Sequence, residues 1–338
     1  MLRRIFCLAI VLAAAGGVMP LTGEKIAALP QVMRPNYLAF TDQRIYVVED
    51  SSKIHIFRRG PEGVVFERTF GEEGEGPGEF GYIHQIRPLA GHLEIPTEGK
   101  FARYTLDGKL IDEVKLPFRV FKNWIFRVGG NYVAKDWRFD NKETVATISL
   151  YDKDLKRIRE LGTHTDAGGV SKINLVAEHY SARVFGEKIF LVESGKETIV
   201  RVHDRDGALE KEVRLPLPPV KVTSALREAI IRPIREQPDM KSRWTAFEPR
   251  IAFPDHTPGL DYFDVVDGKF ITRTYQYRED SVEFVIFDLQ GRELKRLFLP
   301  HTGRLANGRT FCFFQGRYYH LRENLDEETW ELHAEKAW

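Results

Sequence analysis

The residues of this chain that could bind a ligand are polar and aromatic side chains beside short apolar segments. Histidine, aspartate and arginine offer oriented polar contacts, while tryptophan and tyrosine offer stiff apolar area. The candidates are His84, Trp124, Asp136, Trp137, His179, Tyr180, Tyr262 and Arg273. Such a mixture suits a pocket for a small molecule or a peptide, and it equally suits ordinary packing.

A second group of candidates is acidic and ends a series of apolar segments. Its members are Glu49, Asp50, Glu98, Asp136, Glu193 and Glu323. Carboxylates gathered at one face could bind Ca²⁺ or another hard cation. Alternatively, each acid accepts backbone N–H bonds from its own loop, which is the interpretation we favour. His84 and His179 could serve as general bases or Zn²⁺ ligands, but the sequence identifies no partner for them.

We therefore assign no metal site and predict no cofactor, with Ca²⁺ or Zn²⁺ in a central channel as the open alternative. The usual catalytic motifs do not occur: there is no H-E-x-x-H, G-x-S-x-G, Ser-x-x-Lys or C-x-x-C pattern. Cys312, between Phe311 and Phe313, is expected to be a small buried hydrophobic residue rather than a nucleophile. We assign no catalytic residue, and the sequence leans towards binding rather than catalysis.

The overall composition restricts the class of protein. Fifty basic and 49 acidic residues among 338 give a net charge of +1, which argues against a nucleic-acid partner. With 43% hydrophobic and 29% charged residues, the chain should fold around a packed core. The 12% aromatic content, with 23 phenylalanines, favours β structure.

The N-terminus has the pattern of a secretory signal. Arg3 and Arg4 precede an apolar run over residues 5–15, and small residues follow it. We predict that residues 1–17 are a signal peptide, with an uncleaved anchor as the alternative. The run is shorter than the ~20 apolar residues of a spanning helix, so no transmembrane span is expected. Cleavage leaves one cysteine, which favours the bacterial periplasm or the extracellular space.

Repeated hairpins are the main structural signal of the chain. Six times, a short apolar segment, a turn and a second apolar segment follow one another, first over residues 38–50. In the first five units a third and a fourth strand-like segment come next. Four antiparallel strands in each 40–50 residues are typical of a propeller blade.

The sixth unit lacks its own fourth strand. Three fourth strands end in Leu-Pro, at residues 116–117, 215–216 and 299–300, and residues 29–30 end the same way. We therefore expect residues 26–30 to form the outer strand of blade six and to close the ring, which removes an exposed edge. The predicted fold is all-β: one six-bladed propeller domain over residues 24–338, with four antiparallel strands per blade.

The first repeat resembles a known family. Residues 45–50 and 54–57, with the Gly-rich loop over residues 71–80, resemble the strands and loop of NHL-repeat propellers. This resemblance implies a six-bladed ring, and the later blades match it only in outline. It implies little about activity, because NHL-like propellers include interaction modules, lyases and relatives of lactonases.

One long segment departs from the repeat. Residues 217–261 connect blades four and five, and Thr223 and Ser224 could cap a helix over residues 225–231. Pro233 and Pro238 should then bend or end that helix. We expect a partly helical insert. It would either be a lid or binding element near the channel mouth, or pack on the rim of the propeller without a role in binding.

The sequence thus predicts an exported ligand-binding or protein-interaction module, expected to be a monomer. Its partner would be a protein, a peptide or a small molecule, held on the face that carries the inter-blade loops. Two alternatives remain. The first is a lyase or hydrolase whose site lies at the channel mouth and could contain a metal ion. The second is a structural subunit of an envelope complex.

Overall fold

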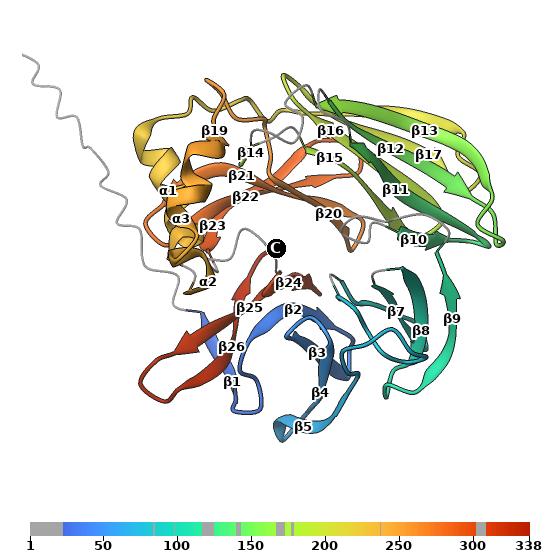
Figure 1. The fold of residues 1–338 in the computed structure, drawn as a ribbon, viewed down its shortest axis with the longest axis vertical. Helices are drawn as coiled ribbons and strands as arrows, with labels where there is room; N and C mark the ends of the chain where they lie inside the picture. Colours follow the sequence, from blue (N-terminus) through green and yellow to red (C-terminus); the bar gives the residue numbers. More distant parts are fainter. Residues whose placement is uncertain are drawn as a thin grey trace, which may run out of the picture.

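The computed structural model describes residues 23–83, 85–97, 99–116, 125–139, 143–166, 173–176, 179–236, 238–301 and 309–338. Their strands form six four-stranded antiparallel sheets, arranged around a common axis (Figure 1). The predicted six-bladed propeller is therefore confirmed. The predicted signal peptide, residues 1–17, lies outside the described residues.

The first three blades follow the chain from its inner to its outer strands. Blade one holds β2 (Pro35–Phe40), β3 (Arg44–Glu49), β4 (Lys53–Gly60) and β5 (Gly63–Phe70); blade two holds β6 (Arg87–Leu89), β7 (His92–Thr97), β8 (Lys100–Thr105) and β9 (Leu110–Lys115); blade three holds β10 (Ile125–Val128), β11 (Asn131–Phe139), β12 (Thr144–Tyr151) and β13 (Arg157–Asp166).

Blades four and five have the same order, and blade six differs. Blade four holds β15 (His179–Phe185), β16 (Lys188–Ser194), β17 (Thr198–Asp204) and β18 (Leu209–Leu215); blade five holds β20 (Tyr262–Val266), β21 (Lys269–Arg278), β22 (Ser281–Asp288) and β23 (Glu293–Pro300); blade six holds β24 (Phe311–Phe314), β25 (Arg317–Asn324), β26 (Thr329–Lys336) and β1 (Glu24–Leu29).

Burial explains why the inner strands are apolar along their whole length. Each sheet packs against a neighbour on both faces, so Tyr46 and Val47, which point to opposite faces of β3, are both fully buried. Tyr46 packs against Ile95 of blade two, and Val47 packs against Leu332 of blade six. The outer strand β5 is largely exposed, because no further strand covers it.

The N-terminal strand closes the ring, as predicted. β1 pairs antiparallel with β26, and Leu29 faces Trp330 across the pair. Leu29 is fully buried in the apolar cluster between blades one and six. Pairing the two ends of the chain in one sheet leaves β26 without a free edge.

The insert contains the predicted helix, which is longer than expected. α1 (Ser224–Arg235) begins after Thr223, whose Oγ1 accepts a hydrogen bond from the Leu226 amide at 3.2 Å. Pro233 does not end α1, because Ile234 and Arg235 follow it in the helix, so, of the two expected effects of this proline, ending the helix is ruled out. Pro238 instead opens α2 (Pro238–Lys241), a first-turn position that suits proline.

The rest of the insert consists of short elements. They are α3 (Trp244–Phe247), the 3₁₀ helix η1 (Glu248–Arg250) and β19 (Ile251–Ala252). β19 pairs in parallel with β14 (Ile173–Asn174), which belongs to the connection between blades three and four. None of the described helices is long and apolar enough to cross a membrane.

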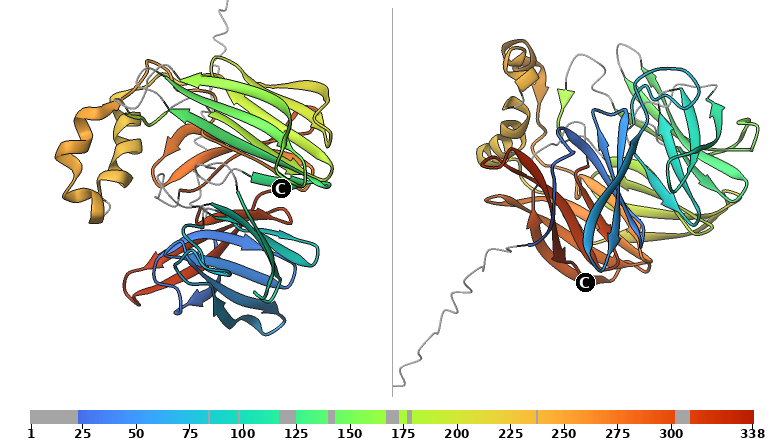
Figure 2. Two further views of the ribbon diagram at one scale, coloured as in Figure 1. Left: turned by 45° about the vertical axis from the view of Figure 1, so that its right-hand side comes forward. Right: turned by 90° about the horizontal axis from the view of Figure 1, so that it is seen from below.

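The insert is anchored to blade five through apolar contacts. Leu226 and Ile230 of α1 pack with Tyr275 of β21, and Val176 from the connection between blades three and four joins them. The helices stand beside blade five at the edge of the ring (Figure 1) and project from it in the turned views (Figure 2). The insert therefore ties two parts of the inter-blade face together.

Candidate functional site

Three charged side chains meet where inner strands surround the axis. Arg183 lies on β15, Asp264 lies on β20, and Arg309 lies two residues before β24. Arg183 Nε lies 3.3 Å from Asp264 Oδ1, and Arg309 Nη2 lies 2.8 Å from Asp264 Oδ2. Blades four, five and six thus each contribute one charge to a single network.

Two tyrosines line this network. The Tyr262 hydroxyl donates to Asp264 Oδ2 at 2.8 Å, since residues two apart on β20 face the same side. The guanidinium of Arg309 lies 5.0 Å from the ring centre of Tyr262 and 5.8 Å from that of Tyr37. We call Tyr37, Arg183, Tyr262, Asp264 and Arg309 the axial cluster.

The axial cluster carries more positive than negative charge. Burial alone would raise the pKa of the Asp264 carboxyl, but Arg309, Arg183 and the Tyr262 hydrogen bond outweigh it and hold that pKa below its ordinary value. One carboxylate therefore faces two guanidinium groups. Nε of Arg309 is buried and has no hydrogen-bond partner among the described residues.

Solvent still reaches these side chains. Arg183 is 11% exposed, Asp264 is 14% exposed and Arg309 is 18% exposed. Part of each side chain therefore remains in contact with solvent, while most of each group is removed from bulk water. Electrostatic contacts in such surroundings are stronger than at an open surface.

Two residues predicted from the sequence, Arg273 and His179, lie beside the axial cluster, and a third, Tyr262, belongs to it. Arg273 forms a two-point contact with Asp261, through Nε at 2.9 Å and Nη2 at 3.0 Å, and its guanidinium lies 5.9 Å from the Tyr262 ring. His179 Nε2 lies 2.8 Å from Ser181 Oγ. Burial, together with the charges of nearby cations including Arg273, lowers the pKa of His179 to about 3, so this histidine is neutral at pH 7.

Two other predicted residues form a separate group between blades three and four. The ammonium of Lys135 lies 4.2 Å from the Trp137 ring and donates to the Tyr180 carbonyl oxygen. The Tyr180 ring is buried and stacks on His164 at 5.4 Å. The protein's own cation occupies the space between these aromatic rings. Trp137 and Tyr180 thus have the packing contacts that the sequence left as the alternative.

The acids at the strand ends mostly bind groups of the protein itself. Asp136 accepts a hydrogen bond from the Trp137 amide at 2.8 Å, and Glu49 accepts one from the Met33 amide at 2.5 Å. Asp50 pairs with Arg34 at 3.1 Å.

The other predicted positions either belong to no group that could hold a metal ion or lie outside the part of the chain that the structure describes. Glu193 pairs with Arg201 at 2.9 Å, and Glu323 is exposed. His84, Glu98 and Trp124 lie outside the described residues. Within the described ranges, no three His, Cys, Asp or Glu side chains are grouped as a metal ion would require.

Cys312 is half-buried rather than fully buried, which corrects the prediction. It lies on the innermost strand β24, whose residues border the axis, and its Sγ is 3.4 Å from the Phe313 carbonyl oxygen. Burial raises the pKa of the thiol to about 11, so the reactive thiolate is scarce at pH 7.

Sequence analysis missed Tyr37, Arg183, Asp264 and Arg309. One signal was present, because Arg183 and Asp264 each stand between two apolar residues of an inner strand. A charged residue in the middle of a buried strand needs a partner, and here the two residues are partners of each other. Nothing in the sequence itself indicated that Arg309 would join them.

Comparison with known proteins supports the architecture but identifies no activity. A family model described as "DUF5128: 6-bladed beta-propeller" matches residues 31–185. No curated protein matches the chain. The NHL assignment made from the first repeat therefore stays a prediction.

Solved structures with similar shape share little sequence. A luciferin-regenerating enzyme is 13% identical, with 92% of this chain and 94% of that chain covered and a TM-score of 0.42. The Pan2 WD40 domain of Neurospora crassa is 9% identical, with 88% and 81% covered and a TM-score of 0.43. A protein of unknown function from Bacteroides caccae is 13% identical, with 83% and 82% covered and a TM-score of 0.36.

At these values the structural similarities carry no argument about function. The architecture follows from the sheets themselves, and the family match extends over blades one to three and the first strand of blade four. The chain is a six-bladed β-propeller whose residues 31–185 match a family described by that same fold.

Proposed function

We propose that this protein is an exported ligand-binding propeller and that its axial cluster receives a small anionic ligand through a carboxylate group. The observation that carries the proposal is that two partly exposed guanidinium groups, those of Arg183 and Arg309, face the single carboxylate of Asp264. A ligand carboxylate would pair the excess positive charge through the exposed part of these side chains.

The charge and shape of the axial cluster support an anion. Two guanidinium groups share the single carboxylate of Asp264, so one positive charge is in excess. An arginine presents its N–H groups in a planar fork that matches a carboxylate in two-point contact. The rings of Tyr37 and Tyr262 would hold the apolar part of the ligand.

The axial cluster also fits the face expected for binding. Tyr37, Tyr262 and Arg309 lie at or just before the starts of inner strands, where the chain arrives from the preceding blade. The inter-blade connections reach this same face. The insert ends there too, at Asp261, which accepts the contact from Arg273.

The enzyme alternative has less support. His179 and Ser181 form a base–hydroxyl pair at 2.8 Å, as a hydrolase would need. However, Ser181 is only 1% exposed, so a substrate could not reach its hydroxyl without rearrangement. A structural role in an envelope complex is supported by no particular contact.

Binding of simple carboxylates tests the proposal. Acetate, succinate and citrate would be titrated by calorimetry and thermal unfolding, with acetamide and succinamide as neutral controls. We expect at least one carboxylate to raise the melting temperature, and Arg309→Gln to abolish the effect; a ligand at 100 times its Kd stabilises by about 2.7 kcal/mol. Arg68→Gln, an exposed position on β5, is the matched control. The proposal would be rejected if carboxylates raised the melting temperature of Arg309→Gln as much as that of the parent protein. It would also be rejected if no carboxylate raised the melting temperature of the parent protein.

Export and an NHL-type origin belong to the same proposal. Export is supported by the charged and apolar pattern of residues 3–15, and the NHL type by residues 45–57 and 71–80. N-terminal sequencing of the native protein should find a start near Gly16 or Gly17. Recovery of Met1 in a membrane fraction would contradict cleavage.

A further inference from the structure

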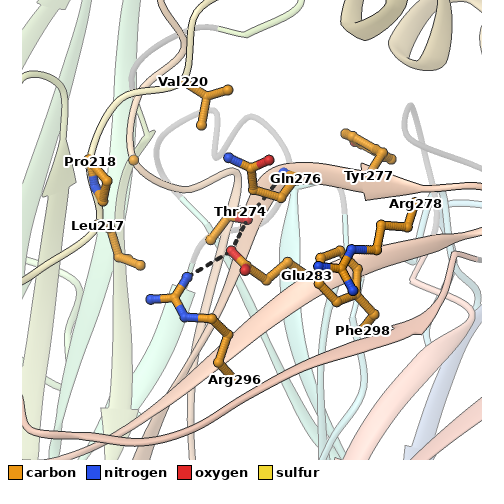
Figure 3. Close-up of a pocket in the computed structure, with 11 residues that line it drawn as sticks. Leu217, Pro218, Val220, Thr274, Gln276, Tyr277, Arg278, Glu283, Arg296 and Phe298 are labelled. Carbon is orange, nitrogen blue, oxygen red and sulfur yellow. Dashed lines mark hydrogen bonds and ion pairs between the residues drawn. The ribbon is translucent and has the colours of Figure 1, made fainter. Parts of the chain in front are cut away.

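A second cavity lies away from the axial cluster, where the start of the insert meets the end of blade five. Its volume is about 180 Å³, and it is open to solvent at one side. Leu217, Pro218 and Val220 form one wall, while side chains of β21, β22 and β23 form the other wall and the floor (Figure 3).

The strand β21 is irregular at this cavity. The pairing of β21 with β22 shifts between Arg273 and Tyr277, so two extra residues are accommodated on β21. The Gln276 amide donates to Thr274 Oγ1 at 3.2 Å within this bulge. Bulges of this kind redirect side chains and often lie beside binding sites. Here Thr274 and Gln276 both line the cavity.

A buried carboxylate forms the floor of the cavity. Glu283 is only 6% exposed, and its Oε2 accepts from Thr274 Oγ1 at 2.8 Å and lies 3.0 Å from Arg296 Nη1 (Figure 3). Arg296 uses its Nε and Nη2 for Glu293. Oε1 of Glu283 takes no hydrogen bond from the described residues, so it can accept one from a ligand.

An unpaired cation lies on the same face of the sheet. The Arg278 guanidinium lies 3.8 Å from the ring centre of Phe298 and forms no ion pair with any described residue. Arg278 is opposite Ser281, which makes it the diagonal neighbour of Glu283. Diagonal neighbours in an antiparallel pair are roughly 7 Å apart. The cavity therefore has one carboxylate oxygen that can accept a hydrogen bond, Glu283 Oε1, and one cation without an ion pair among the described residues, Arg278, close to each other.

We propose that this cavity binds a small zwitterion, a free α-amino acid with an apolar side chain. Its ammonium would donate to Glu283 Oε1, its carboxylate would accept from Arg278, and its side chain would lie against Leu217, Pro218 and Val220. A cavity of about 180 Å³ suits one amino acid rather than a longer peptide.

Three matched ligands test both charges of the zwitterion. L-Leucine has both groups, leucine amide lacks the carboxylate, and 4-methylpentanoate lacks the ammonium. Each would be titrated calorimetrically into the mature protein. We expect leucine to bind and each analogue to bind at least ~10-fold more weakly. Equal binding of either analogue would overturn the zwitterion, and no detectable binding of leucine would overturn the site.

Variants locate the binding. Arg278→Gln and Glu283→Gln should each weaken leucine binding at least ~10-fold, while Arg68→Gln should leave it unchanged. Glu283→Gln also loses its ion pair with Arg296, so Val220→Trp, which fills the cavity without altering a charge, provides a second test. Leucine binding that survives both Arg278→Gln and Val220→Trp would exclude this cavity. Arg309→Gln should not affect it, which separates this inference from the proposed axial site.

Discussion

Tyr262 and Asp264, two residues apart on β20, are joined by a hydrogen bond of 2.8 Å from the phenol to the carboxylate. The same carboxylate oxygen lies 2.8 Å from Arg309. This single oxygen therefore connects blade five to the segment that enters blade six. Its partners explain how a buried aspartate keeps a pKa below its ordinary value in spite of burial.

Removing the Tyr262 hydroxyl should therefore destabilise the protein. Tyr262→Phe withdraws a donor from a buried carboxylate, and we expect a loss of ~1–3 kcal/mol in the free energy of unfolding, measured with urea. Tyr180→Phe is the control, because the Tyr180 hydroxyl is buried without a hydrogen-bond partner among the described residues. Its effect should lie near zero or be stabilising. Similar losses in both variants would contradict this account.

The ring should depend on its N-terminal strand. Deleting residues 24–30 removes the partner of β26 and leaves its edge open, so we expect a large fall in melting temperature or a failure to fold. Leu29→Ala, a milder change in the buried cluster, should lower the free energy of unfolding by ~2–5 kcal/mol. Glu24→Gln removes an exposed ion pair with Arg317 and should have little effect. An unchanged melting temperature after the deletion would refute closure by β1.

His179 should make stability depend on pH. Its pKa is lowered to about 3 in the folded state, below the ordinary value of 6.5, so the unfolded chain binds a proton first as the pH falls. The stabilisation is thus present above pH 6.5 and is lost progressively towards pH 3. At pH 5 the loss from this group should be ~2 kcal/mol.

Unfolding measurements in urea at pH 7.5 and pH 5 would show this dependence. His179→Asn should flatten it, since asparagine does not titrate and can still bond with Ser181 Oγ. His256→Asn is the matched control, because His256 is exposed. If His179→Asn kept the full pH dependence, the shift would belong to another group.

The insert should be held mainly by its apolar face. Ile230 is 2% exposed where α1 meets blade five, so Ile230→Ala should cost ~2–5 kcal/mol in local stability. Hydrogen exchange should show faster exchange of the α1 amides, while amides of blades one and two keep their protection. Ala225→Gly, at an exposed α1 position, separates helix propensity from packing and should cost ~1 kcal/mol. Unaltered exchange in Ile230→Ala would mean that α1 is held by other contacts.

The fold was largely readable from local patterns. Alternating apolar segments and turns located the strands of all six blades, and the Leu29-Pro30 ending pointed to the strand that closes the ring. These features are local because a strand and its turn neighbour lie within a few residues of each other. Pro233 shows the limit of this approach: α1 continues two residues past it, and Leu226 and Ile230 of the same helix pack in the apolar cluster beside blade five.

The candidate sites could not be read in the same way. Trp137 and Tyr180 have the residue types of a binding site, yet the fold places Lys135 against both. Arg278 and Glu283 are diagonal neighbours within one hairpin, but the bulge that places Thr274 and Gln276 beside them and the wall that Leu217 adds from the insert follow only from the fold.

By itself the sequence determined the blades, their order and the place of the insert, because hydrogen-bonded hairpins need only nearby residues. Only the tertiary structure decided that Arg183, Asp264 and Arg309 share one network. These residues come from three blades and are up to 126 positions apart in the numbering from Arg183 to Arg309. Closing the ring brings the inner strands to one axis. Which charged residues meet there cannot be predicted from residues that are near each other in the sequence.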